Sequence, residues 1–467
     1  MKKYVDKVYT HISDRIQRRL FKTPSRLSVS AFSILIGLGA FLLNLPVSSK
    51  HGTLSGIDAL FTATSASCVT GLSVININDT LSLFGQIVLL LLIQVGGLGI
   101  MTISTVFILM AGGKASFAER NLIQDSYTHS GNRGPGAILK DVLMVTFVIE
   151  AAGAALLMIR FWPLYGFKTG AWYAVFHSVS AFCNAGFALF PGGSLEIFRD
   201  DVLVNLVIAT LIVLGGLGFL VISELKNNPP LSRRSWNRIS LHSKLVLVTT
   251  LFLILSGTVV VLAMEWRNTL SGLSVGHKVL ASFFHSITLR TAGFNTIPIY
   301  RMANETLFIS ILMMFIGASP GSCGGGVKTS TFATLFFLGF SRMNGREHTT
   351  AFNRTIPDQT VNKATNMVMI SFFVVGLATM ILLMTEVGRL TYMESMGKFI
   401  EILYETVSAF GTVGLSMGIT DQLTQTGRVI LSIVMFTGRL GPLIVALAIS
   451  RQGDRHFTYA HEDIMVG

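Results

Sequence analysis

Long hydrophobic stretches alternate with shorter, less hydrophobic ones along the 467 residues of the chain. Eight stretches are long enough to cross a bilayer, which takes about 20 helical residues: 28–49, 83–111, 142–161, 202–223, 244–264, 306–340, 365–385 and 427–449. Between the members of each successive pair lies a segment that is too short to cross: 57–68, 172–183, 279–290 and 400–411. The pattern predicts an all-α membrane protein with eight transmembrane helices and four shorter helices between them.

The four short segments resemble one another. Each has an aromatic residue ten positions before a glycine, and each glycine is followed by leucine or phenylalanine. The aligned pairs are Phe61 and Gly71, Phe176 and Gly186, Phe283 and Gly293, and Tyr404 and Gly414. Because each copy contains two full spans, all four enter the membrane from the same side and are parallel repeats. The sequence therefore predicts four span–pore loop–span repeats around a pseudo-four-fold axis.

These repeats set the expected organisation of the chain. The predicted parts are a basic tail at 1–27, pore repeats at 28–111, 112–223, 224–340 and 341–450, of which the last three each begin with a loop, and a C-terminal tail at 451–467. The basic N-terminal tail could lie on anionic membrane lipid or contact a cytosolic partner, and the sequence favours neither.

Charged residues are scarce and unevenly placed. They make up 13% of the chain, whereas soluble proteins carry about 25%, which excludes a soluble enzyme, a nucleic-acid-binding protein and a disordered chain. Of the 36 Lys and Arg residues, 23 fall in the tails and in the loops near 112–141, 224–244 and 341–363, against 11 on the opposite side. Basic loops stay on the cytoplasmic side. Both termini are therefore predicted to be cytoplasmic, and the net charge of +12 reflects topology.

The repeated glycines indicate what the short segments do. Irregular backbone at membrane depth is tolerated where it is buried in protein or lines a water-filled cavity, so each segment is expected to be re-entrant, with a half-helix descending and an extended strand returning. Four such strands around one axis can offer rings of carbonyl oxygens that replace the hydration shell of an ion. The half-helices would point their negative ends toward the axis. A pathway for a monovalent cation is the direct inference.

The motifs around these glycines resemble a known family. The sequences CVTGL, CNAGF, RTAGF and GTVGL, with GASPGSCGGGVKTST at 317–331 and GRLGP at 438–442, are similar to those of the Trk/Ktr/HKT superfamily of potassium transporters. The resemblance covers nearly the whole chain from about residue 28. It is closer to the bacterial Ktr membrane subunit, because no additional pair of spans precedes the first repeat.

The resemblance implies a K+-selective filter built from each glycine and the two residues before it. The implied filter residues are Val69, Thr70, Gly71, Asn184, Ala185, Gly186, Thr291, Ala292, Gly293, Thr412, Val413 and Gly414. It further implies a homodimer in the cell membrane with one pore per subunit, and a cytosolic ring of nucleotide-binding regulatory subunits of the KtrA or RCK type. K+ is the expected transported ion, Na+ is a second candidate, and no organic cofactor is expected on this chain.

The second span of the third repeat contains a run of small residues. Five glycines and one proline among ten positions disfavour a continuous helix, so we expect an irregular loop that lines a cavity. The resemblance identifies this run as an intramembrane gating loop. The candidate gate residues are Gly317, Ala318, Ser319, Pro320, Gly321, Ser322, Cys323, Gly324, Gly325 and Gly326, together with the charged Lys328 and Arg439.

Charges inside predicted spans are usually functional or paired. Arg439 could hold the carbonyls of the loop closed, repel a cation or form a structural pair, and Lys328 could do the same or pair near the membrane surface. For Glu150 we favour helix packing over ion binding, and for Arg290 a brace of the third pore loop. The GGLG sequences at 96–99 and 215–218 are interpreted as helix-packing sites.

Two other classes of function stay open at this point. A secondary transporter that couples K+ uptake to Na+ or H+ would use the same residues as a channel-like pore. A membrane-embedded enzyme is less favoured, because Glu150 is the one intramembrane acid that the sequence indicates, and the ten histidines show no metal-binding spacing. Cys68 and Cys183 occupy equivalent places, three residues before their glycines, and are interpreted as small packing residues.

Overall fold

The computed structural model describes residues 24–99, 135–227, 229, 232–388, 390–442 and 444–445. Most of the predicted N-terminal tail, the end of the span predicted at 83–111 with the loop after it, and the C-terminal tail at 451–467 lie outside the described residues. Within them the chain is mostly helical, as the hydrophobic pattern predicts.

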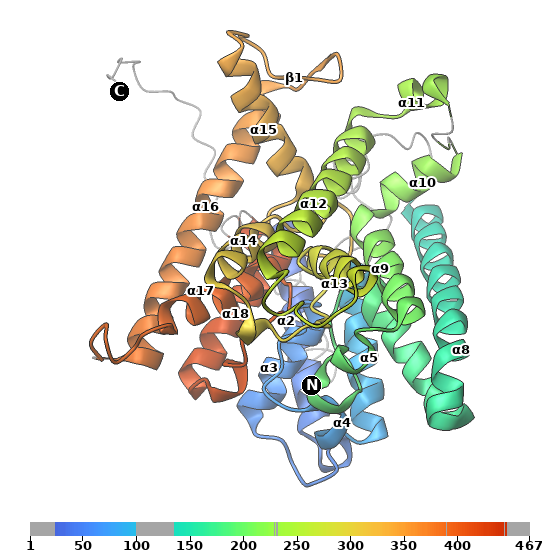
Figure 1. Cartoon of the computed structure of the whole chain (residues 1–467), viewed down its shortest axis with the longest axis vertical. Helices are drawn as coiled ribbons and strands as arrows, with labels where there is room; N and C mark the ends of the chain where they lie inside the picture. The colour runs from blue at the N-terminus through green and yellow to red at the C-terminus, as the bar shows by residue number, and fades with distance from the viewer. Residues whose placement is uncertain are drawn as a thin grey trace, which may run out of the picture.

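The helices follow one another along the chain in the order shown in Figure 1. They are α2 (Pro24–Asn44), α3 (Gly56–Ser67), α4 (Ile77–Thr80), α5 (Leu83–Gly97), α8 (Pro135–Phe182), α9 (Val202–Leu217), α10 (Phe219–Asn227), α11 (Arg233–Arg238), α12 (Leu241–Glu265), α13 (Val275–Thr288), α14 (Asn304–Phe315), α15 (Thr329–Met343), α16 (Asp358–Leu382), α17 (Lys398–Gly411) and α18 (Gln425–Leu440). The π-helical turn η5 (Leu383–Val387) extends α16, and an antiparallel hairpin of β1 (Thr350–Ala351) and β2 (Arg354–Thr355) follows α15.

Several of these helices could cross a membrane by length and composition. Four described helices qualify: Arg26–Asn44, Lys140–Phe182, Leu241–Glu265 and Asp358–Val387. The bent pair formed by α9 and α10 would be a fifth, and α5 and α14 are shorter apolar helices. The predicted count of eight spans stays a prediction.

One predicted span needs correction. The stretch 202–223 is not one straight span, because α9 ends at Leu217, α10 begins at Phe219, and the two axes differ by 99°. Gly218 between them has a φ of +89°, a conformation that glycine adopts readily. The predicted span 142–161 and the short segment 172–183 are separate, as expected, because non-helical angles at Gly166 (φ 74°, ψ 171°) break α8 into two helices between them.

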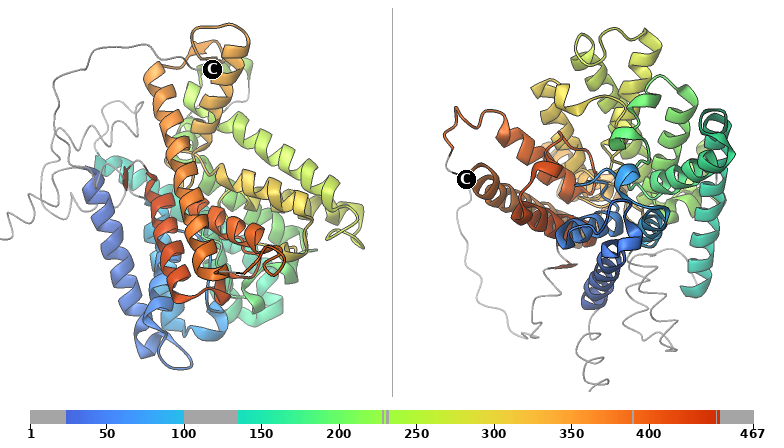
Figure 2. Two further views of the ribbon diagram at one scale, coloured as in Figure 1. Left: turned by 90° about the vertical axis from the view of Figure 1, so that its left-hand side faces the viewer. Right: turned by 90° about the horizontal axis from the view of Figure 1, so that it is seen from below.

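The helices surround the centre of the molecule in chain order. Viewed from below (Figure 2, right), the blue, teal-to-green, yellow and orange-to-red parts of the chain follow one another around the middle. Helix contacts join each part to the next: α5 with α8, α9 with α13, α14 with α17, and α18 back to α3. The arrangement is closed because the last part packs on the first.

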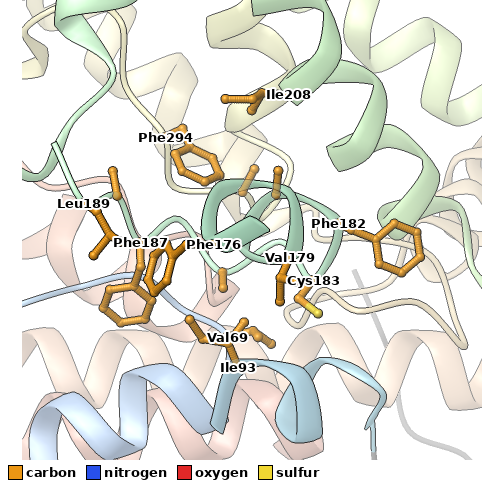
Figure 3. Packing of buried hydrophobic residues seen from close by; sticks show 14 of the residues in the cluster. Val69, Ile93, Phe176, Val179, Phe182, Cys183, Phe187, Leu189, Ile208 and Phe294 are labelled. Carbon is orange, nitrogen blue, oxygen red and sulfur yellow. The ribbon is translucent and has the colours of Figure 1, made fainter. Parts of the chain in front are cut away.

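The interior is filled by the ends of the short helices. Phe61, Phe176 and Tyr404, three of the four aromatic residues that mark the repeated segments, are fully buried. Figure 3 shows Val179 of α8 and the adjoining Cys183 on the side of Val69 and Ile93 from the first part of the chain. The outer face of α16 is apolar too, because its Phe372 and Phe373 are more than 60% exposed. An apolar outer surface of this kind suits contact with lipid.

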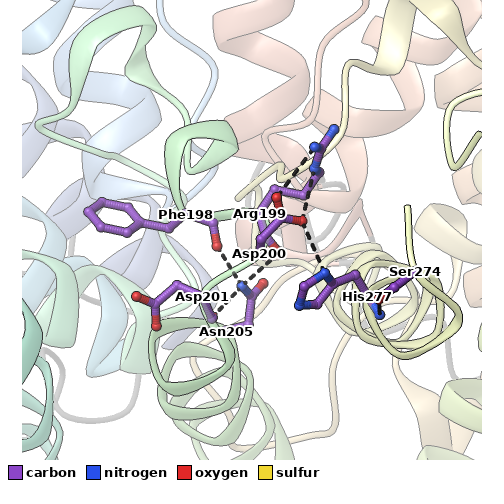
Figure 4. Close-up of polar contacts among 7 residues, drawn as sticks. All are labelled: Phe198, Arg199, Asp200, Asp201, Asn205, Ser274 and His277. Carbon is purple, nitrogen blue, oxygen red and sulfur yellow. Dashed lines mark hydrogen bonds and ion pairs between the residues drawn. The ribbon is translucent and has the colours of Figure 1, made fainter. Parts of the chain in front are cut away.

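Polar side chains fix where the helices after the glycines begin. Asp201 caps α9 by accepting a hydrogen bond from the Val204 amide, and Ser82 and Thr424 cap α5 and α18 in the same way. Figure 4 shows the neighbouring surface contacts, in which Asp200 lies 3.8 Å from His277 at the start of α13. These contacts connect the second part of the chain to the third.

Candidate functional site

Four glycine segments leave the ends of α3, α8, α13 and α17. We define them as the first (69–71), second (184–186), third (291–293) and fourth (412–414). In each, the residue two before the glycine has a positive φ: Val69 (49°), Asn184 (58°), Thr291 (62°) and Thr412 (50°). Such angles are uncommon for residues other than glycine and cost most for β-branched ones. Their recurrence at one position of all four segments means that the surroundings impose this conformation.

The glycines of the four segments meet the backbone of one another. A Cβ atom built on each would collide with the carbonyl oxygen that precedes the glycine of the next segment. The distance from the added Cβ atom to the carbonyl oxygen is 2.6 Å for Gly71 and Ala185, 2.7 Å for Gly186 and Ala292, 2.5 Å for Gly293 and Val413, and 2.0 Å for Gly414 and Thr70. The four contacts close into a ring. Glycine is required at each point, both by its positive φ and by this close approach.

The segments are held from behind in different ways. In the first and fourth, a serine of the preceding helix accepts a hydrogen bond from the glycine amide: Ser65 from Gly71 at 3.1 Å and Ser408 from Gly414 at 3.0 Å. In the second, the hydroxyl at this position, Ser180, donates to the Phe187 carbonyl instead. The third has Ile287 there, which makes no such bond.

The run of small residues between α14 and α15 forms an irregular loop, as its sequence predicts. The Ser319 and Cys323 amides donate to the carbonyls of Gly216 and Gly215 at 3.1 Å each. The loop therefore covers the C-terminal end of α9, where the Pro320 carbonyl fills the space beside Gly218. This contact explains why the helix breaks at that point.

The same loop contacts the third and fourth glycine segments. The Gly325 amide donates to the Thr412 hydroxyl at 2.9 Å, and a Cβ on Gly324 would lie 2.1 Å from the Thr291 hydroxyl oxygen. Both threonines are the positive-φ residues of their segments. The loop thus lies directly against one end of the ring.

Two basic side chains hold the carbonyls of this loop. The buried Arg439 guanidinium donates to the Cys323 carbonyl and to the Gly96 carbonyl, the latter in the first part of the chain. Lys328 donates to the Gly324 carbonyl at 2.6 Å. Of the roles considered for Arg439, the contacts are those of a residue that holds loop carbonyls in place.

Glu150 and Arg290 differ in how they are accommodated. Glu150 is buried in α8 and accepts a hydrogen bond from Gln94 at 3.1 Å, which fits the predicted helix contact. Arg290 is also buried, but its Nε and Nη2 atoms have no hydrogen-bond partner within the described residues. It therefore does not brace the third segment through those atoms.

Three further glycines, Gly96, Gly215 and Gly438, pack against the ends of the short helices. A Cβ atom would lie 2.0 Å from the Ser67 carbonyl oxygen at Gly96, 1.8 Å from that of Phe182 at Gly215 and 1.9 Å from that of Phe410 at Gly438. These distances agree with the helix-packing interpretation. Cys68 and Cys183 are fully buried, as expected of packing residues.

Two acids besides Glu150 are buried, and the sequence analysis singled out neither of them. Glu405 in α17 and Glu265 at the end of α12 are 1% and 0% exposed. Glu265 accepts hydrogen bonds from the Ala303 amide and the Thr306 hydroxyl and so holds the start of α14, which has no side-chain cap. Glu405 directly follows the aromatic Tyr404 of the repeat, and comparing that position among the four copies would have singled it out.

Each contact of the ring brings a main-chain carbonyl oxygen of one segment against the glycine of another. Across the described ranges, no three His, Cys, Asp or Glu side chains come together as metal ligands would. Carbonyl oxygens gathered by four glycine segments suit a weakly hydrated monovalent cation. A closed bundle of apolar helices around such a ring belongs to the class of membrane proteins that move cations.

Comparisons with known proteins agree with this class. The family model of the cation transport protein TrkH matches residues 6–459, and the chain belongs to this family. It is 36% identical over 456 residues to the Ktr system potassium uptake protein B of Bacillus subtilis, covering 97% of this chain and 99% of that protein. It is also 36% identical over 465 residues to the potassium/sodium uptake protein NtpJ of Enterococcus hirae, covering 98% and 100%.

A solved structure shares the fold. The crystal structure of the potassium transporter TrkH from Vibrio parahaemolyticus superposes with a TM-score of 0.70 at 17% identity, covering 90% of this chain and 83% of that one. At this identity the likeness concerns the fold alone.

Proposed function

We propose that this chain is the membrane subunit of a potassium uptake system, in which K+ passes through the ring formed by the four glycine segments. The observation that carries the proposal is the closed set of contacts from each glycine to the carbonyl before the next one. Relatives at 36% identity that are potassium uptake proteins support K+ as the transported ion. Na+ is a second candidate because one of those relatives is a potassium/sodium uptake protein.

The physical basis of selection is the replacement of water by carbonyl oxygens. An ion enters when the oxygens compensate for its lost hydration, and it leaves when no single site binds it too tightly. The positive φ at the residue two before each glycine turns the chain out of its helix, so that the next carbonyls can approach the axis. Four parallel span–pore loop–span repeats, with the boundaries given above, would place the rings on a pseudo-four-fold axis.

The loop 317–326 is proposed as the gate. Its hydrogen bonds to Gly215 and Gly216 anchor it on α9, its hydrogen bond to Thr412 holds it against one end of the ring, and Arg439 binds its Cys323 carbonyl. A barrier made of glycine, serine and alanine has little side-chain packing to lose when it moves. Breaking a few hydrogen bonds of about 1 kcal/mol each is within reach of a regulatory partner.

The partners follow from the same family likeness. We propose a homodimer in the cell membrane with both termini in the cytoplasm, regulated by a cytosolic ring of nucleotide-binding subunits. The excess of basic residues in the loops on one side of the predicted topology supports that orientation.

Uptake by a host that lacks its own K+ transport tests the function. The chain should restore growth at low K+, and the purified chain in liposomes should carry K+ without a Na+ or H+ gradient. Flux that strictly requires a co-ion gradient would instead identify a coupled transporter. A control variant is Gly37→Ala in α2, where a Cβ atom would meet no atom within 4 Å, and it should carry K+ as the wild-type chain does.

A further inference from the structure

A buried carboxylate stands behind the fourth glycine segment. Glu405 lies in the middle of α17 and is 1% exposed. Its Oε1 atom accepts a hydrogen bond from the Thr420 hydroxyl, whereas Oε2 has no partner among the residues that the structure describes. A buried acid that is not paired with a basic residue is costly, so its position calls for a role.

Glu405 ends a chain of hydrogen bonds that begins just after Gly414. The Gly418 amide donates to the Ser416 hydroxyl oxygen at 2.9 Å, and the Ser416 and Thr420 hydroxyl oxygens are 2.9 Å apart. A hydroxyl has one proton to donate. The Thr420 hydroxyl lies within donating reach of both the Glu405 carboxylate and the Ser416 hydroxyl oxygen and has one proton for the two, so Thr420 links Ser416 to the carboxylate.

The other three segments lack this relay. The residue that follows the repeated aromatic position is Thr62 in the first part of the chain, His177 in the second, Phe284 in the third and Glu405 in the fourth. The Thr62 hydroxyl has no partner among the described residues, and His177 accepts one hydrogen bond, from the Leu189 amide at 3.2 Å. Phe284 has no polar atom to offer.

We propose that Glu405 is a positioning residue for ion selection, through its carboxylate oxygen rather than its charge. As the acceptor at the end of the relay, it fixes residues 416–420 and thereby the backbone of Gly414, whose amide is bonded to Ser408 of the same helix. The inference rests on the proposed function of the glycine segments. It assigns to the fourth segment a rigidity that the third does not have.

Two substitutions separate the acceptor from the charge. Glu405→Gln keeps an oxygen for the Thr420 hydroxyl, whereas Glu405→Ala removes it and leaves the relay without an acceptor. We expect Glu405→Ala to raise the KM for K+ and to lower the preference for K+ over Na+ by about tenfold, the factor that corresponds to one lost buried hydrogen bond, with a smaller change in maximal rate. Glu405→Gln should stay within about twofold of the wild-type protein.

Thr62→Val is the matched control, because it changes a buried hydroxyl at the same repeat position that makes no hydrogen bond within the described residues. It should leave KM and ion preference unchanged. Ser416→Ala interrupts the relay from its other end and is the second variant if Glu405→Ala does not fold. It should shift KM and ion preference in the same direction as Glu405→Ala.

The measurement is K+ uptake with and without competing Na+, in the deficient host and in liposomes, with the melting temperature of each purified variant. Equal losses in Glu405→Gln and Glu405→Ala, or wild-type ion preference in folded Glu405→Ala, would overturn the inference. A wild-type chain that carries Na+ as readily as K+ would overturn the proposed function and this inference together. A selective wild type with an unaffected Glu405→Ala would overturn the inference alone.

Discussion

The third and fourth glycine segments share one backbone path but are held in place by different means. Behind the fourth, Ser408 binds the Gly414 amide and a polar relay ends on the buried Glu405. Behind the third, the corresponding side chains are Ile287 and Phe284, and the nearby Arg290 has two unpartnered nitrogen atoms within the described structure. Two segments with the same backbone conformation can thus be held by different side-chain contacts. The four segments therefore need not contribute equally to the selection of the ion.

The two segments also differ in their contact with the loop 317–326. Thr412 of the fourth accepts a hydrogen bond from the Gly325 amide, whereas Thr291 of the third meets Gly324 through close packing. A change in the loop should therefore be felt first by the fourth segment. The predictions below test this difference, from the largest expected effect to the smallest.

Gly414→Ala should damage K+ uptake more than Gly293→Ala. The new methyl group would lie 2.0 Å from the Thr70 carbonyl oxygen at Gly414 but 2.5 Å from that of Val413 at Gly293, and the polar brace prevents the fourth segment from yielding. Strain of about 1–3 kcal/mol at each site corresponds to a loss of K+ affinity of about tenfold or more. Concentration-dependent uptake measures this loss. Equal losses in the two folded variants would contradict the ranking, and wild-type affinity in both would remove these glycines from the ion path.

Deleting several glycines of the loop 317–326 should raise K+ flux in the absence of any cytosolic partner. A loop that excludes the ion is the highest barrier on the path, so its removal lowers the limiting step. Selectivity should fall less than flux rises, because the contacts that close the ring join the four glycine segments to one another and do not include the loop. Arg439→Ala should act in the same direction with a smaller effect, since it releases the loop without removing it. K+ flux into liposomes is the measurement, and loss of flux in a folded deletion variant would place the gate elsewhere.

Ser408→Ala should loosen the backbone of the fourth segment, whereas Ile287→Val removes no hydrogen bond and should leave the third segment nearly unchanged. The first removes the hydrogen bond to the Gly414 amide, worth about 1 kcal/mol, and the second removes one methylene group. We expect a rise of about fivefold in the KM for K+ in Ser408→Ala and a smaller change in Ile287→Val. The reverse order would contradict the distinction between a braced and an unbraced segment.

Arg290→Met should stabilise the protein in detergent. A buried guanidinium with unpartnered nitrogens carries a desolvation cost that an apolar side chain of similar length avoids. The melting temperature is expected to rise by a few degrees with little change in K+ affinity. A fall in both would show that Arg290 has a partner that supports the third segment.

The sequence predicted the repeat of aromatic residue and glycine, the interrupted helix and the residues of the ring, because these depend on local spacing and on glycine chemistry. It did not predict the break at Gly218, where the Pro320 carbonyl packs against the end of α9. It also did not predict the burial of Glu265 and Glu405. Both depend on segments that are distant in sequence and become neighbours only in the folded chain. Hydropathy did separate the span 142–161 from the short segment 172–183, and the non-helical angles at Gly166 break α8 between them.

The most direct test of the account is the ratio of K+ to Na+ flux into liposomes, measured for the loop-deletion variant with an intact ring and with Gly414→Ala. With the gate removed in both proteins, any difference comes from the ring. The account predicts that the deletion variant still prefers K+ and that adding Gly414→Ala abolishes most of this preference. The same preference in both proteins would contradict the claim that the four glycine segments select the ion.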